Sequence, residues 1–255
     1  MNNGVIVITG ASEGIGAALA KLAGGQGNKV VLAARTEAKL RTVASEVGDN
    51  ALVVVTDVTR RADVERLKVM ALERFGHVDV WVNNAGRGIS KPVLELTDDE
   101  VDQMVAINLK SDLYGMQAII PHFVERGAGH LINVSTVLSK VPFVPLRAAY
   151  SAAKAGLNIL TANLRMSLAA YPQIHVSLVL PGVVRTQFFE NALGGTPNWQ
   201  GTTAQGAQTA EEVAAVIAEV MDNPRPEVYT NPASPEMVRR YSEDIAGFEA
   251  SLARR

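Results

Sequence analysis

Tyr150 and Lys154 lie four residues apart, a spacing that suits proton transfer. A phenol has an ordinary pKa of about 10, so it exchanges protons at neutral pH only when a nearby cation stabilises its phenolate. Positions i and i+4 share one face of a helix, with Cβ atoms about 5–6 Å apart, which would place the Lys154 ammonium beside the Tyr150 hydroxyl. Taken alone, the pair also fits a surface helix turn with an incidental tyrosine and lysine. Four further motifs favour the chemical interpretation.

The first motif is a glycine cluster between an expected strand and an expected helix. Its spacing is G-x-x-x-G-x-G, whereas the common dinucleotide fingerprint is G-x-G-x-x-G. Glycines at this place let the chain turn tightly, approach a pyrophosphate and present backbone N–H groups at a helix N-terminus. The expected cofactor contacts here are Gly10, Ser12, Glu13, Gly14, Ile15 and Gly16.

The second expected strand is followed by Arg35 and Thr36. A fold that prefers NAD commonly carries an acid here, which binds the ribose 2′-hydroxyl. An arginine can instead pair with the 2′-phosphate of NADP through charge-assisted hydrogen bonds. The sequence therefore favours NADP(H) over NAD(H). Two points remain open: Arg35 could simply solvate a helix start, and Glu13 would add negative charge nearby.

Two polar clusters follow the next strands. Asp57, followed by Val58, could accept a hydrogen bond from the adenine amino group, or could equally cap the following helix. Asn84, Ala85 and Gly86 permit close approach to the adenosine ribose, and the amides of Asn83 and Asn84 can tie neighbouring strands together. A plain turn is the alternative interpretation of this cluster.

Short apolar runs alternate with segments of helical period along the whole chain. Such alternation predicts βαβ units and a doubly wound, Rossmann-type parallel sheet of about seven strands, with helices on both faces in a three-layer α/β sandwich. Ligands bind beyond the carboxyl ends of such strands, where every motif described here lies. The predicted strands are 5–9, 29–34, 51–56, 78–83, 130–134, 174–180 and 227–229; the main predicted helices are 15–26, 37–47, 61–75, 149–171 and 210–221, with a helical tail from about Pro235.

Length and composition predict one domain over residues 1–255. Hydrophobic residues make up 47% and charged residues 20%, which is ordinary for a globular protein, and the net charge of −2 gives no broad basic field for nucleic acid or membrane. The absence of cysteine fits a reducing compartment. We found no signal peptide and no apolar run of about 18 residues, so a cytoplasmic protein without a membrane span is expected. Residues 188–208 form a predicted loop, either a substrate lid or a passive insertion.

Taken together, the motifs resemble the short-chain dehydrogenase/reductase family in its single-domain form. The resemblance covers nearly the whole chain and implies a nicotinamide cofactor, reversible hydride exchange between an alcohol and a carbonyl compound (EC 1.1.1.-), no metal, and a homodimer or homotetramer that packs the Tyr150 helix against its copy. The motifs stand in the family's order: Thr9 to Gly16, Asn83 to Gly86, Asn108, Tyr150 to Lys154, and Pro181 to Thr186.

The resemblance also implies roles for single residues. Tyr150 would be the general acid for carbonyl reduction and the base for alcohol oxidation. Lys154 would lower the pKa of Tyr150 and hold the nicotinamide ribose, and Asn108 would hold a water that links Lys154 to solvent, unless it is an ordinary polar helix residue. Pro181 and Gly182 would cover the nicotinamide, whose carboxamide would bind Val184 and Thr186.

The serine that polarises the substrate carbonyl in this family is displaced in this chain. It normally lies 13 residues before the tyrosine, and in this chain the residue 13 positions before Tyr150 is Val137. When the end of the predicted strand 130–134 is aligned with the family's strand instead, Thr136 takes the position of the catalytic serine. The Thr136 hydroxyl can donate the same hydrogen bond to the substrate carbonyl. Ser135 is the second choice, because strand alternation should turn it away. Ser139 is the third, and a loss of activity is also conceivable.

Three hypotheses for function follow. The leading one is an NADP(H)-dependent oxidoreductase acting on a carbonyl or secondary alcohol. An epimerase or dehydratase is less well supported, because about 70 residues after Pro181 leave little room for a substrate domain. The third is a non-catalytic NADP(H)-binding regulatory protein. Substrate identity stays open, although Arg87 and Arg147 could meet an anionic tail or could both lie at the surface.

Overall fold

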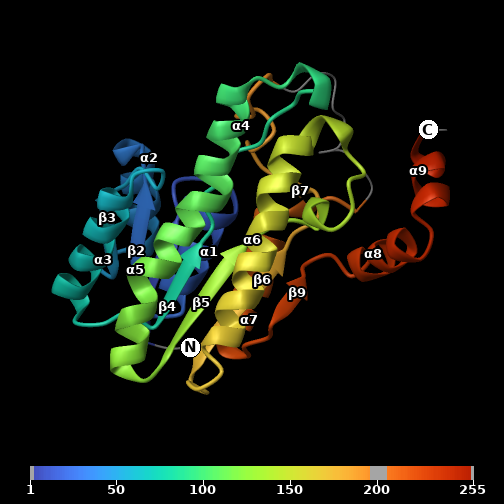
Figure 1. Cartoon of the computed structure of the whole chain (residues 1–255). Coiled ribbons are helices and arrows are strands. Elements are labelled where there is room, and N and C mark those ends of the chain that lie inside the picture. Colours follow the sequence, from blue (N-terminus) through green and yellow to red (C-terminus); the bar gives the residue numbers. More distant parts are fainter. Residues whose placement is uncertain (1–2, 196–205, 254–255) are drawn as a thin grey trace.

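Seven parallel strands form the central sheet of the computed structural model, which describes residues 3–195 and 206–253 (Figure 1). The strand order is β3-β2-β1-β4-β5-β6-β9. All six pairings are parallel, which agrees with the βαβ units predicted from the alternating pattern. The strands are β1 (Val5–Thr9), β2 (Lys29–Ala34), β3 (Ala51–Val55), β4 (Val80–Asn83), β5 (Gly129–Val134), β6 (Ile174–Leu180) and β9 (Glu227–Tyr229).

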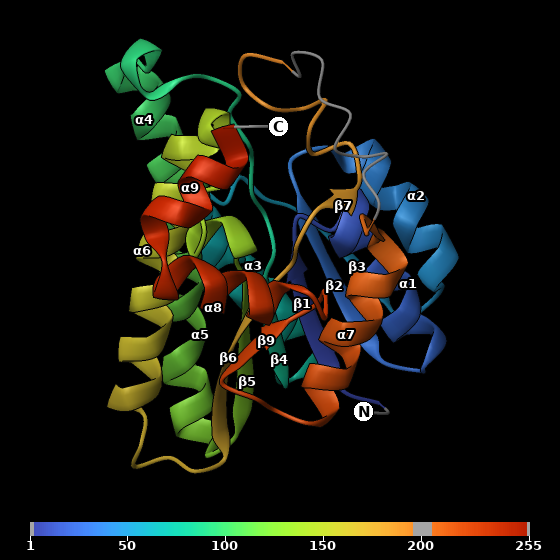
Figure 2. The same cartoon turned by 90° about the vertical axis from the view of Figure 1, so that its right-hand side faces the viewer.

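The sheet is buried on both faces, so its strands are apolar almost throughout. In β1, Ile6 and Ile8 contact one hydrophobic core, whereas Val5 and Val7 contact the other, as the two-residue period of a strand requires. Figure 2 shows the two layers of helices that cover these faces. The predicted three-layer sandwich is therefore confirmed. The first face carries α1 (Gly14–Gly25), α2 (Glu37–Val47) and α7 (Ala210–Asp222), and the second carries α3 (Arg61–Phe75), α5 (Ser111–Arg126) and α6 (Ala148–Ser167).

The second face also contains a helical irregularity. The helix α4 (Asp98–Val105) runs into a π-helical turn, Ala106–Lys110, which leads directly into α5. A π turn widens the helix by one residue and is frequent at functional sites. Asn108 lies inside this turn.

One helix end differs from the prediction. The predicted helix 149–171 ends at Ser167 as α6, and the Tyr171 N–H donates to the Leu168 carbonyl in the turn that follows. Pro172 prevents the helix from continuing through Tyr171, because a proline disfavours helical backbone at the residue before it.

The C-terminal part adds a small parallel pair, β7 (Val184–Arg185) with β8 (Gln208–Thr209). The predicted tail forms two helices, α8 (Ser234–Glu243) and α9 (Ile245–Ala253), which lie beyond β9 (Figure 1). Of the predicted loop 188–208, residues 196–205 lie outside the described residues.

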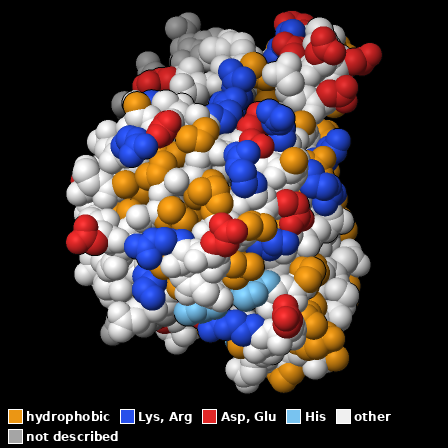
Figure 3. Space-filling model, turned by 90° about the vertical axis from the view of Figure 1, so that its left-hand side faces the viewer, with side chains coloured by type: hydrophobic (Ala, Val, Ile, Leu, Met, Phe, Trp, Pro, Cys, Tyr) orange, Lys and Arg blue, Asp and Glu red, His pale blue; other side chains and the backbone are white. Residues whose placement is uncertain are grey.

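The strand order reverses between β1 and β4, the point at which doubly wound sheets bind their ligands. On the face drawn in Figure 3, acidic side chains gather at the top right, and hydrophobic side chains form groups left of centre and at the lower right. Within residues 3–195 and 206–253, no helix is long and apolar enough to cross a bilayer. The same described part contains no cluster of His, Asp or Glu side chains suited to a metal ion.

Candidate active site

A cleft of about 810 Å³ opens at the carboxyl ends of the strands. This volume lies within the range of small-molecule and cofactor sites. Almost all of the residues predicted for the site line the cleft; Gly16 and Asn108 do not. Those that line it are Gly10, Ser12, Glu13, Gly14, Ile15, Arg35, Thr36, Asp57, Val58, Asn84, Ala85, Gly86, Ser135, Thr136, Tyr150, Lys154, Pro181, Gly182, Val184 and Thr186.

The glycine loop has the backbone geometry of an anion site. Gly10 and Gly14 have φ values of 65° and 56°, in the left-handed region that side chains disfavour. Helix α1 begins at Gly14, and its N-cap residue, Glu13, makes no side-chain capping bond. The N-terminal N–H groups of α1 therefore keep their capacity to bind a phosphate.

Asn84 secures this loop to the next strand. Its Nδ2 donates to the Thr9 carbonyl at 3.0 Å and the Gly10 carbonyl at 3.3 Å. Asn83 ties β4 to β5, because its Nδ2 donates to Asn133 Oδ1 at 2.9 Å. The predicted strand-tying role of these amides is therefore observed, and a plain turn does not describe them.

At the far end of the cleft, Arg35 lies exposed beside a second cation, Lys39, which the sequence interpretation missed. The Lys39 ammonium pairs with the Glu13 carboxylate at 2.7 Å. The negative charge that counted against NADP(H) is thus partly compensated. The sequence could have indicated Lys39, because position 39 lies four residues after Arg35.

Asp57 does not cap helix α3, whose N-cap is Arg60. Its Oδ1 instead accepts from the N–H of Thr59 at 3.0 Å and from the Thr59 hydroxyl at 2.7 Å. The helix-cap alternative is therefore wrong. Asp57 closes a local turn, which is a common use of aspartate next to a backbone N–H two residues on.

The catalytic candidates lie near the start of α6. Tyr150 and Lys154 are 7% and 2% exposed, so the alternative of a surface helix turn is wrong. Burial raises the pKa of Tyr150 above its ordinary range, while a hydrogen bond with Thr136 and the positive charge of Arg147 lower it. The phenol is consequently protonated at neutral pH. A direct effect of Lys154 on this pKa stays a prediction.

Arg147 is buried rather than at the surface, with 2% of its area exposed. Its Nη1 donates to the Ile89 carbonyl at 3.0 Å, and its guanidinium lies 5.0 Å from the centre of the Phe189 ring. The alternative of a surface arginine is therefore wrong at this position. Arg87 is half-buried, and its Nε donates to the Asn191 carbonyl at 2.9 Å.

Thr136 and Ser135 point to different surroundings. Ser135 Oγ donates to Asn158 Oδ1 at 2.6 Å, whereas the Thr136 side chain acts on Tyr150 and lowers the pKa of the phenol. Ser139 Oγ donates to the Thr136 carbonyl at 2.5 Å and accepts from Asn158 Nδ2. This geometry favours Thr136 for carbonyl polarisation, as strand alternation suggested.

Asn108 is fully buried and its side chain is occupied by protein partners. Oδ1 accepts from the Arg87 N–H at 3.0 Å, while Nδ2 donates to the Arg87 carbonyl at 2.9 Å and the Met104 carbonyl at 3.1 Å. The amide therefore fixes the loop that follows β4. Its proposed part in proton supply stays a prediction.

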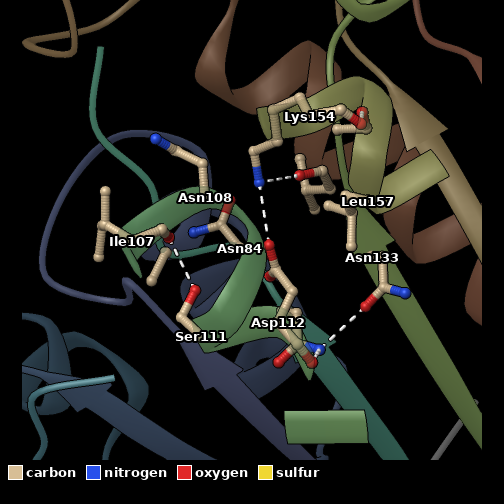
Figure 4. Close-up of polar contacts among 12 residues, drawn as sticks. Asn84, Ile107, Asn108, Ser111, Asp112, Asn133, Lys154 and Leu157 are labelled. Carbon is tan, nitrogen blue, oxygen red and sulfur yellow. Dashed lines mark hydrogen bonds and ion pairs between the residues drawn. The ribbon is translucent and has the colours of Figure 1, made fainter. Parts of the chain in front are cut away.

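Lys154 has a partner that the sequence interpretation missed. Figure 4 shows its side chain reaching from α6 toward Asp112 on α5. Lys154 Nζ lies 3.2 Å from Asp112 Oδ2 and donates to the Val134 carbonyl at 3.0 Å. Asp112 lies four residues after Asn108, and positions four apart share one face of a helix. A predicted helix over this segment would therefore have placed Asp112 on the same face as Asn108.

The described part of the 188–208 loop crosses the cleft. Asn191 Nδ2 donates to Glu13 Oε1 at 2.7 Å, and Leu193 forms a parallel bridge with Ile89. The rings of Phe188 and Tyr150 meet edge to face, with centroids 5.3 Å apart. This segment therefore links the glycine loop to the wall of the catalytic pocket.

Comparison with known proteins agrees with this geometry. The sequence profile of the short chain dehydrogenase family matches residues 4–194, three quarters of the chain. The chain belongs to the short-chain dehydrogenase family. An uncharacterised oxidoreductase of Staphylococcus aureus (strain USA300) is 39% identical over 183 residues, which cover 71% of this chain and 78% of that protein.

Two solved structures that resemble this chain hold different cofactors. An enzyme of the family from Burkholderia phymatum, in complex with NAD, has a TM-score of 0.87 at 28% identity and covers 96% of this chain and 94% of its own. An alcohol dehydrogenase from the archaeon Thermococcus sibiricus, complexed with 5-hydroxy-NADP, has a TM-score of 0.77 at 27% identity, with 89% and 95% covered. The nucleotide that is bound therefore differs between these two structural neighbours.

Proposed function

We propose that this chain is an NADP(H)-dependent oxidoreductase that exchanges a hydride between the nicotinamide and a carbonyl or secondary alcohol substrate. The observation that carries the proposal is the buried Tyr150 phenol, which shares one cleft with the Thr136 hydroxyl and the glycine loop. A hydroxyl donor and a phenol acid in one site suit reduction of a carbonyl group. Arg147 beside the phenol suits a substrate with an acidic or strongly polar end.

The proposed mechanism assigns one step to each group. The bound nicotinamide supplies or accepts the hydride. Thr136 donates a hydrogen bond to the substrate carbonyl oxygen, which gains negative charge as reduction proceeds. Tyr150 then gives its proton to that oxygen, or removes one when an alcohol is oxidised. Pro181, Gly182, Val184 and Thr186 would hold the nicotinamide, and Lys154 would hold its ribose.

Titration with NADPH and NADH, followed by nicotinamide fluorescence, is the first test. Binding of NADPH, and then turnover of at least one member of a panel of carbonyl compounds, is the expected result. Tight binding without any turnover would point to a non-catalytic regulatory protein, and binding of neither nucleotide would contradict the proposal.

Arg35→Ala should weaken NADPH binding about tenfold or more while changing NADH binding less than about threefold. A charge-assisted hydrogen bond contributes about 1.5–3 kcal/mol, and only NADPH has the 2′-phosphate to accept it. Arg41→Ala is the matched control, because Arg41 is an exposed arginine of α2, the helix that begins two residues after Arg35, and it pairs with Glu37. Equal losses of affinity for NADPH and NADH would show that Arg35 does not bind the 2′-phosphate.

Thr136→Val should lower kcat about a hundredfold, because it removes the hydroxyl and keeps the shape of the side chain. Ser135→Ala should keep kcat within about threefold, since Ser135 is turned toward Asn158. The two variants are to be compared in steady-state turnover of the same substrate with NADPH. The opposite ranking would assign the role to Ser135.

We further propose a homodimer or homotetramer that packs α6 against its copy. Ile159 and Met166 support this arrangement, because they lie two turns apart on α6 and are 65% and 66% exposed. Light scattering on the purified chain would test it, and a monomer would contradict it. The absence of cysteine supports a cytoplasmic location, which localisation of a tagged chain would check.

A further inference from the structure

The Lys154–Asp112 pair lies in the interior, next to the acid that the proposed function requires. Both side chains are nearly inaccessible, with 3% and 2% of their areas exposed. Each charge would be costly to bury alone, so each depends on the other and on the polar groups around it. Lys154 Nζ donates to Asp112 Oδ2 at 3.2 Å and to the Val134 carbonyl at 3.0 Å.

The backbone of Asp112 is held by a buried hydrogen-bond network. It occupies the first turn of α5, directly after the π-helical turn. Its backbone carbonyl accepts from Asn83 Nδ2 at 3.1 Å, and Asn83 is itself bonded to Trp81 and Asn133. Asn133 Nδ2 in turn donates to Thr161 on α6. This buried network joins β4, β5, α5 and α6 and holds the backbone of Asp112. Figure 4 shows the Asp112 carboxylate beside the Lys154 ammonium.

In the described part of the chain, the charged groups that act on Tyr150 come from two elements besides its own helix. Arg147 lies at the 3₁₀ turn before α6 and favours the phenolate, whereas Asp112 on α5 disfavours it. Strand β5 contributes only the neutral Val134 carbonyl to Lys154. Because the Lys154 ammonium is paired with the Asp112 carboxylate, its positive charge stabilises a Tyr150 phenolate less than an unpaired ammonium would.

We propose that Asp112 is a positioning residue that offsets the charge of Lys154 and thereby keeps Tyr150 in its protonated form, which favours proton donation to a carbonyl over proton removal from an alcohol. This inference rests on the proposed function. It explains why an acid is buried beside a lysine whose expected role is to stabilise a phenolate. Burial raises the pKa of Asp112 to about 6, with Lys154 opposing the rise, so the carboxylate is charged at neutral pH.

The test is a titration of Tyr150 in Asp112→Asn, which removes the charge and nearly keeps the shape. The near-ultraviolet absorbance of ionised tyrosine is followed against pH, and the curve of the same protein carrying Tyr150→Phe is subtracted. We expect the pKa of Tyr150 to fall by about one unit relative to wild type, the effect of removing one nearby negative charge. Asp49→Asn, which alters an exposed acid far from the cleft, should leave it unchanged.

Turnover supplies the second readout. In Asp112→Asn, the rise of kcat/KM for alcohol oxidation with pH should move to lower pH by the same amount, which a purely structural role would not produce. The titration requires no turnover, so it distinguishes failure of this inference from failure of the proposed function. An unchanged titration curve in a folded Asp112→Asn protein overturns the inference.

Asp112→Ser is the second variant, in case the asparagine leaves the ammonium without adequate partners. It removes the same charge and leaves room for a water beside Lys154. The same fall in the pKa of Tyr150 is expected. If neither variant folds, Asp112 is a structural residue and the inference fails.

Discussion

Tyr150→Phe should lower kcat at least about a hundredfold while leaving NADPH binding within about threefold of wild type. The substitution removes the phenol hydroxyl, the only group of the proposed mechanism that gives a proton to the substrate, and proton transfer of this kind contributes about 10²–10⁴-fold. The ring still fits its site, because its edge-to-face contact with Phe188 does not need the hydroxyl. Single-turnover kinetics with NADPH, together with a binding titration, would measure both quantities.

Tyr171→Phe is the matched control for that experiment. Tyr171 is 40% exposed and lies in the turn after α6, so loss of its hydroxyl should change neither kcat nor binding. A Tyr150→Phe enzyme whose kcat stays within a few fold of wild type would remove Tyr150 from the mechanism and leave its burial as a matter of packing.

Gly16→Ala should lower the free energy of unfolding by about 1–3 kcal/mol and weaken NADPH binding more than tenfold. A Cβ at this position would overlap the Gly10 carbonyl oxygen and lie 2.6 Å from Asn84 Nδ2. Neither neighbour can move freely, because Asn84 is bonded to the Thr9 and Gly10 carbonyls. The start of α1 would therefore shift away from the phosphate site. Denaturant unfolding and a fluorescence titration would report the two effects.

Gly25→Ala is the corresponding control in the same helix. In the described part of the chain, no atom beyond the adjoining residues and backbone of α1 lies within 4 Å of a Cβ built at Gly25, so the added methyl group should leave NADPH binding unchanged. Stability should stay the same or rise by up to about 1 kcal/mol, because alanine has the higher helix propensity. Equal behaviour of the two variants would show that close approach at Gly16 is not required.

Much of the fold could be predicted from local pattern. A strand buried on both faces must be apolar throughout, and a helix must repeat its apolar residues every three or four positions, so the strands of the sheet could be recognised within one or two residues. Helix ends were harder to predict where the turn after the helix also contains apolar residues. The helix predicted over 149–171 ends at Ser167, and apolar residues follow in the turn. The site motifs could be located because each follows a strand, and the carboxyl ends of parallel strands meet at one edge of the sheet.

The sequence by itself determined the fold class, the family and the position of the cleft, because these depend on spacing within single βα units. Which partner each site residue meets depends on contacts between elements far apart in the chain, and only the tertiary structure decided it. Spacing suggested that Lys154 stabilises the Tyr150 phenolate, yet α5 brings Asp112 to the ammonium. Likewise, strand alternation favoured Thr136, and Asn158 on α6 then showed where Ser135 points. Charge balance in a buried site is a property of the assembled fold, since it sums over groups that only folding brings together.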